Sequence, residues 1–207
     1  MPTDLYCATG NAAKLREFQQ AAGDAFRVHP LPSAACPETG DTFETNAREK
    51  ALWYSRAVWQ DKSMREKRGC WIFADDSGLE IDHLAGAPGI YSARYAGPGA
   101  DDAANNALVL QKLRGVRREK RTARFVCCIA LAREREVIKT FRGEVSGYIL
   151  TALAGGGGFG YDPLFWVPQL GATFSEVTAK EKWRLSHRGT AFREMIAWLR
   201  GDAEATG

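Results

Sequence analysis

The feature that most constrains this chain is the stretch from Ile72 to Gly97, I-F-A-D-D-S-G-L-E-I-D-H-L-A-G-A-P-G-I-Y-S-A-R-Y-A-G. Its apolar start predicts the end of a buried strand. Asp75 and Asp76 follow, where we expect that strand to open into a Gly-containing turn. Because successive side chains of an extended chain point to opposite sides, only one of the two acids can face a given pocket. We therefore expect one catalytic and one supporting carboxylate, placed to hold a metal ion.

Taken alone, the run Asp-Asp-Ser-Gly is typical of a solvated turn, because all three residue types favour turns. Three further polar clusters in other predicted loops argue instead for one shared site. They are Thr9-Gly10-Asn11 with Lys14, Gly155 to Asp162, and Lys182 with Ser186-His187-Arg188-Gly189.

Length and composition set broad limits. With 207 residues, the chain is long enough for one large α/β domain or for two lobes that flank a cleft. The net charge of +3 does not require a polyanionic partner and does not disfavour a small phosphorylated substrate. The five cysteines include no C-x-x-C pair, so we expect reduced thiols. We see no secretory signal, and the longest apolar stretch, Phe125 to Ala132, is too short for a bilayer. The prediction is a cytoplasmic protein.

The N-terminal cluster joins a strand to a helix. Leu5 to Ala8 is apolar, the loop from Thr9 to Lys14 is polar, and apolar residues then recur at helical spacing. Such a junction directs backbone N–H groups and the positive helix end at a ligand, and Lys14 adds a full charge, so phosphate is the expected ligand. An ordinary helix start is the alternative. The candidate phosphate-binding residues are Thr9, Gly10, Asn11, Ala12, Ala13 and Lys14.

A second strand is predicted over residues 26–31, and Asp41 or Thr42 is expected to cap the helix that follows. On that helix, Asn46 and Lys50 are four residues apart and share a face, which is either part of a site or simply solvated. Glu38 lies in the loop before the helix, free to turn toward a cleft.

The stretch from Lys112 to Arg124 holds seven cations and one acid, and it is the only segment that argues for nucleic-acid binding. No aromatic residue is interleaved in it for base stacking, so we interpret it as a solvated linker. Beyond it, 125–132 and 137–148 predict two long antiparallel strands. Residues 178–181 predict a capping box, and 201–207 predict a frayed tail.

Five motifs in this order resemble the inosine triphosphate pyrophosphatase family over about residues 5 to 200. They are T-G-N-x-x-K at Thr9 to Lys14, A-D-D-S-G-L at Ala74 to Leu79, G-A-P-G-I-Y-S-A-R-Y at Gly86 to Tyr95, G-F-G-Y-D-P at Gly158 to Pro163, and S-H-R-G at Ser186 to Gly189. The resemblance implies an α/β fold with a long curved mixed sheet, flanking helices and two lobes around a central cleft, all in one catalytic domain over residues 1–200. It also implies a Mg²⁺-dependent homodimer that hydrolyses ITP, dITP and XTP to the monophosphate and pyrophosphate.

Roles follow from the resemblance and from the charge of the substrate. A triphosphate needs a divalent cation and basic groups to neutralise the charge that develops during attack by water. Asp76 is expected to bind the metal and to take the proton of the water. Glu38 or, as the alternative, Glu44 is expected to join Asp75 in completing the metal shell. Phosphate contacts are expected from Thr9, Asn11, Lys14 and Lys50, and the wider set of predicted substrate contacts adds Asn46, Ser77, Gly160 and Tyr161.

Base selection can be argued from hydrogen bonding. Hypoxanthine and xanthine carry an oxygen at position 6, so donors from His187 and Arg188 would favour them and leave adenine unpaired. Phe159 is expected to stack on the ring, Asp162 to accept a ring N–H, and Lys182 to reach the base or the phosphates. Two alternatives stay open. One is a nucleotide phosphatase of other base specificity that releases orthophosphate, and the other is a non-catalytic nucleotide- or RNA-binding module.

Overall fold

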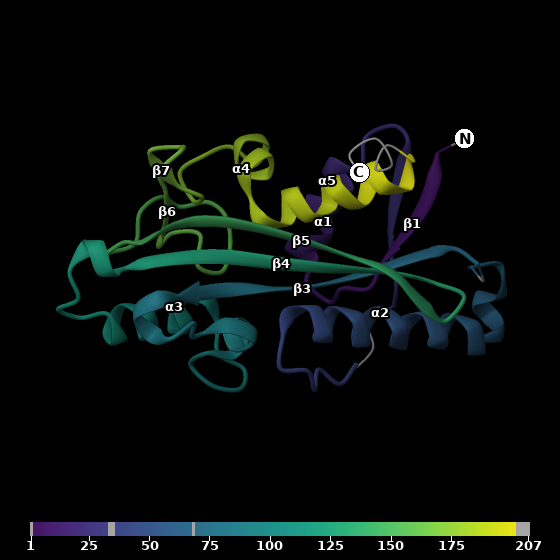
Figure 1. The fold of residues 1–207 in the computed structure, drawn as a ribbon, viewed down its shortest axis with the longest axis horizontal. Helices are drawn as coiled ribbons and strands as arrows, with labels where there is room; N and C mark the ends of the chain where they lie inside the picture. Colours follow the sequence, from purple (N-terminus) through teal and green to yellow (C-terminus); the bar gives the residue numbers. More distant parts are fainter. Residues whose placement is uncertain (1, 33–35, 68, 202–207) are drawn as a thin grey trace. The chain divides into compact units, whose positions relative to one another are not determined.

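The computed structural model describes residues 2–32, 36–67 and 69–201. Within it the chain divides into two compact units (Figure 1). Unit 1 comprises residues 1–76, 127–143 and 188–207, and unit 2 comprises residues 77–126 and 144–187. Apart from Gly201, the predicted frayed tail over 201–207 lies outside the described residues.

A mixed β-sheet has the strand order β2-β1-β3-β4-β5-β6-β7. β1 pairs in parallel with β2 and with β3, whereas β6 pairs antiparallel with β5 and with β7. This arrangement confirms the predicted α/β class with a mixed sheet. The strands are β1 (Thr3–Cys7), β2 (Phe26–Pro30), β3 (Trp71–Ile81), β4 (Thr122–Arg133), β5 (Glu136–Ile149), β6 (Phe165–Val167) and β7 (Ala172–Thr173).

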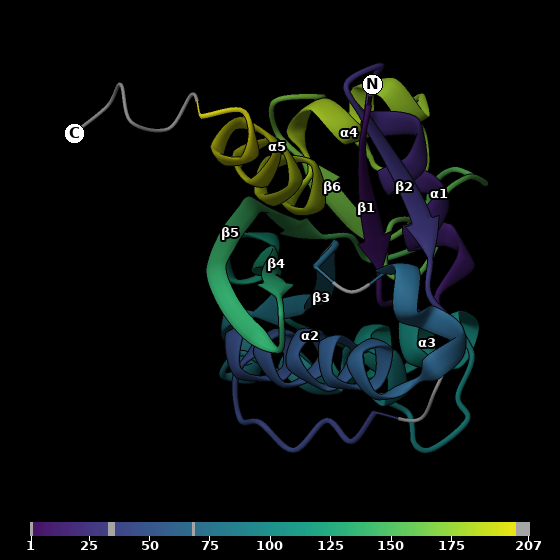
Figure 2. The ribbon, with the colours of Figure 1, turned by 90° about the vertical axis from the view of Figure 1, so that its right-hand side faces the viewer.

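Unit 1 carries its long helices on opposite faces of its strands. α2 (Phe43–Gln60) lies on one side of β4 and β5, while α5 (His187–Leu199) lies on the other (Figure 2). Phe18 of α1 (Ala12–Ala21) packs against Phe73 of β3 and Phe192 of α5, with ring centroids 5.1 Å from each. This aromatic contact fixes α1 and α5 beside the strand that carries Asp75.

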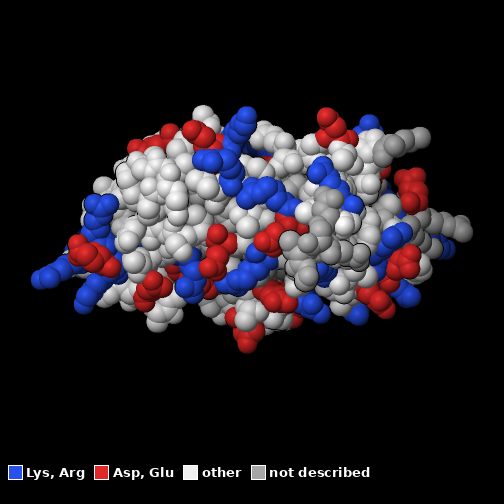
Figure 3. Space-filling view, turned by 45° about the horizontal axis from the view of Figure 1, so that its top comes forward, with Lys and Arg blue, Asp and Glu red and all other residues white. Residues whose placement is uncertain are grey.

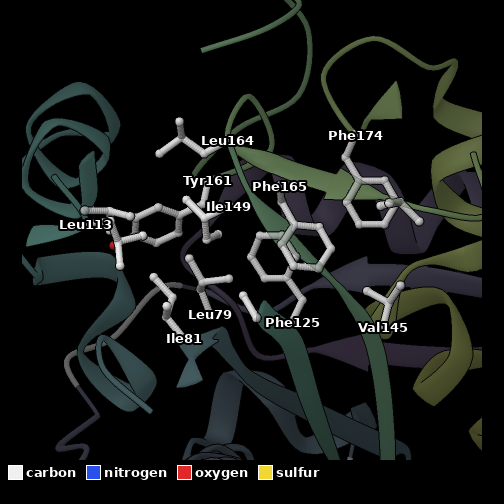
Figure 4. Packing of buried hydrophobic residues seen from close by; sticks show 13 residues of the cluster. Leu79, Ile81, Leu113, Phe125, Val145, Ile149, Tyr161, Leu164, Phe165 and Phe174 are labelled. Carbon is white, nitrogen blue, oxygen red and sulfur yellow. The ribbon is translucent and has the colours of Figure 1, made fainter. Parts of the chain in front are cut away.

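Unit 2 has its own hydrophobic core. Figure 4 shows the rings of Phe125, Phe165 and Phe174 packed together, with Tyr161 and Leu79 nearby. Phe125 and Phe165 have ring centroids 4.5 Å apart. α3 (Asp102–Lys112) contributes Val109 to this core, while α4 (Ala179–Leu185) precedes α5.

The predicted end of the third strand is wrong. β3 continues through Asp75, Asp76 and Gly78 to Ile81 instead of opening into a turn at the acids. Leu79 and Ile81 are both fully buried, so the strand keeps apolar side chains to pack after the acids. The turn preference of Asp, Ser and Gly is therefore overridden by strand pairing and burial.

Several local predictions are confirmed. Thr42, one of the two expected caps, accepts an N–H group at the start of α2, and Thr178 with Glu181 forms the expected capping box. Glu134 and Arg135 alone connect β4 to β5, and both have positive φ, as a tight type I′ hairpin requires. A two-residue connection also makes these neighbouring strands antiparallel, as predicted.

All five cysteines are free, and three of them are buried. In the described part of the chain, no helix has both the length and the apolar character needed to cross a bilayer.

Candidate active site

The polar loop before α1 is held by its own side chains. Asn11 caps the helix, because its Oδ1 accepts the N–H groups of Ala13 and Lys14 at 2.9 and 3.1 Å. The N–H of Asn11 in turn donates to Thr9 Oγ1 at 3.2 Å. The loop from Thr9 to Lys14 is thus a capped helix start that also presents exposed backbone at Gly10. Lys14 extends from it to Asp75, with Nζ 2.8 Å from Oδ2.

Asp75 is a buried anion surrounded by cations. Burial alone would raise its pKa, but the charges of Lys14, Arg188 and Lys50 outweigh burial and lower the pKa to about 2. Arg188 Nε lies 3.8 Å from Asp75 Oδ2. Asp75 is therefore ionised at neutral pH, and its charge holds the cations of unit 1 in place.

Asp76, the next residue of β3, contacts the opposite helix. Its Oδ2 accepts the Nδ2–H of Asn46 on α2 at 3.1 Å, whereas Asp75 is paired with Lys14 on α1. The alternation expected of an extended chain thus separates the two acids. Burial raises the pKa of Asp76, and this effect exceeds the opposing influence of Lys14 and Lys50. Asp76 is the better proton acceptor of the pair.

Lys50 connects the loop before α2 to the acids. Its Nζ lies 2.6 Å from Glu38 Oε1 and donates to the backbone carbonyl of Asp75 at 3.2 Å. Burial would lower the pKa of Lys50, but Asp75 and Glu38 raise it overall. Glu44 instead accepts a hydrogen bond from Thr140 Oγ1 on β5. Of the two alternatives for a third acid, Glu38 contacts the cluster through Lys50, whereas Glu44 bonds to Thr140 on β5.

One residue of this cluster was missed in the sequence. Glu17 accepts a hydrogen bond from Arg188 Nη1 at 2.6 Å, so that Arg188 lies between Glu17 and Asp75. Glu17 stands three residues after Lys14 on α1, and this spacing places both on one helix face. That spacing was the available signal. Arg188 itself was predicted as a base contact, and its contacts in the structure are with these two acids of unit 1.

Unit 2 contains a second polar cluster. Lys182 Nζ lies 2.6 Å from Asp162 Oδ2, and the same ammonium lies 4.4 Å from the centroid of the Phe159 ring. Asp162 Oδ2 also accepts the N–H of Phe159 at 2.9 Å. Gly158 has φ +75°, and a Cβ there would lie 2.3 Å from Asp162 Oδ2. The glycine-rich loop is therefore shaped around this carboxylate rather than being merely flexible.

The remaining predicted residues of unit 2 have structural contacts. The His187 ring is buried and stacks on Phe125 with centroids 4.8 Å apart. Tyr161 belongs to the hydrophobic core, and its hydroxyl donates to the Ser92 carbonyl at 2.8 Å. Gly160 donates its N–H to Asp102 and accepts from Asn106 through its carbonyl. Ser77, the first residue of unit 2, is partly buried in β3.

The motifs on which these clusters rest match a known family over nearly the whole chain. The Ham1 family model matches residues 5–198. The chain belongs to the Ham1 family. This membership confirms the relationship inferred from the five motifs. Among its relatives, the dITP/XTP pyrophosphatase of Acidobacterium capsulatum is 44% identical, over 97% of this chain and 100% of the relative. The one from Exiguobacterium sibiricum is also 44% identical, over 94% of this chain and 96% of the relative.

Solved structures of Ham1 proteins agree with the fold. The Staphylococcus aureus Ham1 protein has a TM-score of 0.81 at 36% identity, covering 97% of this chain and 100% of that one. A nucleoside-triphosphatase / dITP/XTP pyrophosphatase from Mycobacterium abscessus has a TM-score of 0.70 at 35% identity, over 95% of this chain and 99% of that one.

Proposed function

We propose that this Ham1 protein is a nucleoside triphosphate pyrophosphatase that hydrolyses deaminated purine nucleotides, such as dITP, ITP and XTP, to the monophosphate and pyrophosphate. The observation that carries the proposal is the cluster of unit 1, in which Asp75 and Asp76 lie next to each other with Lys14 and Lys50 beside them. Relatives at 44% identity that bear the name dITP/XTP pyrophosphatase support the same activity.

The acids of unit 1 suit Mg²⁺ by their chemistry. Mg²⁺ prefers oxygen ligands and keeps several waters, so one or two carboxylates suffice to bind it. Among the described residues, no three acid, His or Cys side chains already converge on a common point. Lysines now contact Glu38 and Asp75, and an incoming polyphosphate would compete for those lysines. We assign Asp76 and Glu38 to the metal, with Asp75, whose side chain is paired with Lys14 on the other side of β3, as the supporting acid. When bound, the ion would neutralise charge on the phosphates and polarise them for attack.

The residues of unit 1 have separate roles in the hydrolysis. Asp76 accepts the proton of the attacking water, because its pKa is raised by burial and its carboxylate is oriented by Asn46. Lys14 and Lys50 donate to phosphate oxygens, and the positive end of the α1 dipole adds to the attraction for phosphate. Asp75 remains ionised, and its contact with Lys14 positions that lysine.

The cluster of unit 2 is assigned to the base. Phe159 offers a ring for stacking, and Lys182 and Asp162 form a donor–acceptor pair beside it. Lys182 and His187 are donors for the 6-oxygen of a deaminated purine, and Asp162 is an acceptor for a ring N–H. We also assign Arg188 as a hydrogen-bond donor to the 6-oxygen of the base. A guanidinium has five N–H groups, so its contact with Glu17 does not exhaust them.

The experiment that tests the function is an assay on ITP, dITP, XTP, GTP and ATP, with and without Mg²⁺, in which pyrophosphate and orthophosphate are quantified separately. We expect pyrophosphate from the first three substrates, and little product from GTP or ATP. Orthophosphate as the main product would favour the phosphatase alternative. Binding without turnover would favour the non-catalytic module. The homodimer implied by the family and the cytoplasmic location expected from the sequence remain predictions, and sedimentation of the purified protein tests the first.

A further inference from the structure

A pocket of about 280 Å³ in unit 2 is lined by none of the residues assigned above to phosphate, metal or base. Its walls come from the connection between α3 and β4, from the end of β5 and from β6. The side chains that matter here are Arg118, Arg121, Tyr148, Thr151 and Trp166. This volume is at the low end for small-molecule sites, so it suits a single base or phosphate better than a complete nucleoside triphosphate.

Arg121 places a positive charge in the wall of this pocket. The residue is only 3% exposed, and its guanidinium donates to the carbonyls of Leu113, Ile149 and Leu150. Those bonds satisfy donors but neutralise no charge, and among the described residues no acid pairs with Arg121. Burial accordingly lowers its pKa. A buried charge without a counterion attracts an anion to the pocket that it lines.

Two aromatic side chains also line the pocket. Tyr148 of β5 and Trp166 of β6 are directly paired across the two antiparallel strands, so their side chains emerge on the same face. Both are only partly buried, and both line the pocket. Two neighbouring aromatic rings beside a cation form the kind of platform on which bases stack. The sequence did not reveal it, because these rings lie 30 and 48 residues after Arg118.

Exposed cations are frequent in the segment that carries Arg118. Lys112, Arg114, Arg117, Arg118 and Lys120 are all exposed, and none of them forms an ion pair with another described residue. Figure 3 shows Lys and Arg side chains projecting at the end where, in Figure 1, the connection between α3 and β4 lies. Glu119 is the single acid within this run.

We propose that this surface, from Lys112 to Lys120 together with the pocket at Arg118, Arg121, Tyr148 and Trp166, binds single-stranded nucleic acid. One base would stack against Tyr148 and Trp166, while the flanking phosphates would contact the exposed cations. A row of cations outside a pocket of this size matches a chain of phosphates better than one free nucleotide. A duplex does not fit, because its bases are not available for stacking in a pocket.

The proposal is tested with single-stranded DNA and RNA of about 12 nucleotides, labelled with fluorescein. Their binding is followed by anisotropy titrations between about 50 and 200 mM KCl, the range over which binding to phosphates weakens strongly. We expect binding that weakens steeply as salt rises. Arg118→Ala should weaken it about fivefold or more, and Trp166→Ala should weaken it by roughly 5- to 100-fold, as loss of one stacked base predicts. The matched control is Arg27→Ala, which removes one exposed cation from β2 in unit 1 and should change binding less than twofold.

Three results would overturn the proposal. The first is no binding at 50 mM KCl, and the second is an equal loss in Arg118→Ala and Arg27→Ala. The third is displacement of the labelled DNA or RNA by excess ITP or by AMP, because such competition would mean that the nucleic acid binds at a site for free nucleotides. Because Arg118 is exposed, its variant tests the surface even if Trp166→Ala fails to fold. Pyrophosphatase activity is measured in parallel and should be unchanged in Arg118→Ala, so failure of either proposal is seen separately.

Discussion

The ammonium of Lys182 lies 2.6 Å from Oδ2 of Asp162, and the two side chains are 7% and 4% exposed. Burying one charge of such a pair without the other is expensive, so removal of either partner should destabilise unit 2. We expect Lys182→Met or Asp162→Asn alone to lower the free energy of unfolding by up to about 5 kcal/mol. The double variant should lose less than the sum of the two single losses. Urea denaturation of the four proteins measures this coupling. Additive losses would mean that the pair is not coupled.

Gly158 should be irreplaceable for a steric reason. An alanine there would be strained at φ +75°, and its Cβ would lie 2.3 Å from Asp162 Oδ2. We expect Gly158→Ala to raise KM for ITP by roughly tenfold or more, because it displaces the carboxylate beside Phe159. Gly156→Ala is the matched control in the same loop, since nothing lies within 4 Å of a Cβ at that position. Similar kinetics for both variants would refute the steric explanation.

Sequence patterns succeeded where the determinant is local. Thr42 and Thr178 stand next to the N–H groups that they cap, so these helix starts could be predicted from a few adjacent residues. Asp75 and Asp76 were identified as acids of a site, but their position within β3 was not, because strand pairing with distant segments decides where that strand ends.

Contacts between distant segments account for the remaining differences. Arg121 lies in a run of cations that predicts a solvated linker, yet it is buried because its carbonyl acceptors include Ile149, the last residue of β5, and Leu150 just after it. Glu17 was overlooked for a similar reason, since its partner Arg188 is 171 residues away. No pattern within either segment encodes such a partner.

Asp76 is predicted to be the residue most sensitive to loss of its charge. Asp76→Asn keeps the size of the side chain but removes the proton acceptor, so we expect kcat to fall by about 10²- to 10⁴-fold. The melting temperature should stay the same or rise, because burial already disfavours the charged form.

Glu38→Gln and Glu44→Gln form a matched pair of variants that tests which of the two acids binds the metal. Only Glu38→Gln should raise the Mg²⁺ concentration needed for half-maximal activity, and a larger effect of Glu44→Gln would reverse that assignment.

Asp75 makes stability dependent on pH in a defined direction. Its pKa is about 2 in the folded protein and 3.8 as the ordinary reference value, so the folded state favours the ionised form. This contribution is complete above pH 3.8 and is lost as the pH falls toward 2. It corresponds to roughly 2 kcal/mol. Urea denaturation of the metal-free protein at pH values from about 2 to about 6, which include the ordinary carboxyl pKa values, measures this contribution. An Asp75→Asn variant with the same acid dependence as the wild type would contradict the assignment.

Base selection is predicted to depend on the donors at the start of α5. If His187 and Arg188 donate to the 6-oxygen of the substrate, their loss removes an interaction that ITP makes and ATP cannot make. We expect His187→Ala or Arg188→Ala to lower the ratio of kcat/KM for ITP over ATP by about tenfold or more, mainly through ITP. His83→Ala, which removes an exposed histidine of unit 2, is the control and should leave the ratio unchanged. Arg188→Lys separates charge from geometry, because lysine keeps the positive charge near Asp75 but cannot donate from a planar fork. If the ratio is unaltered in both alanine variants, the base is read by Lys182 and Asp162 without them.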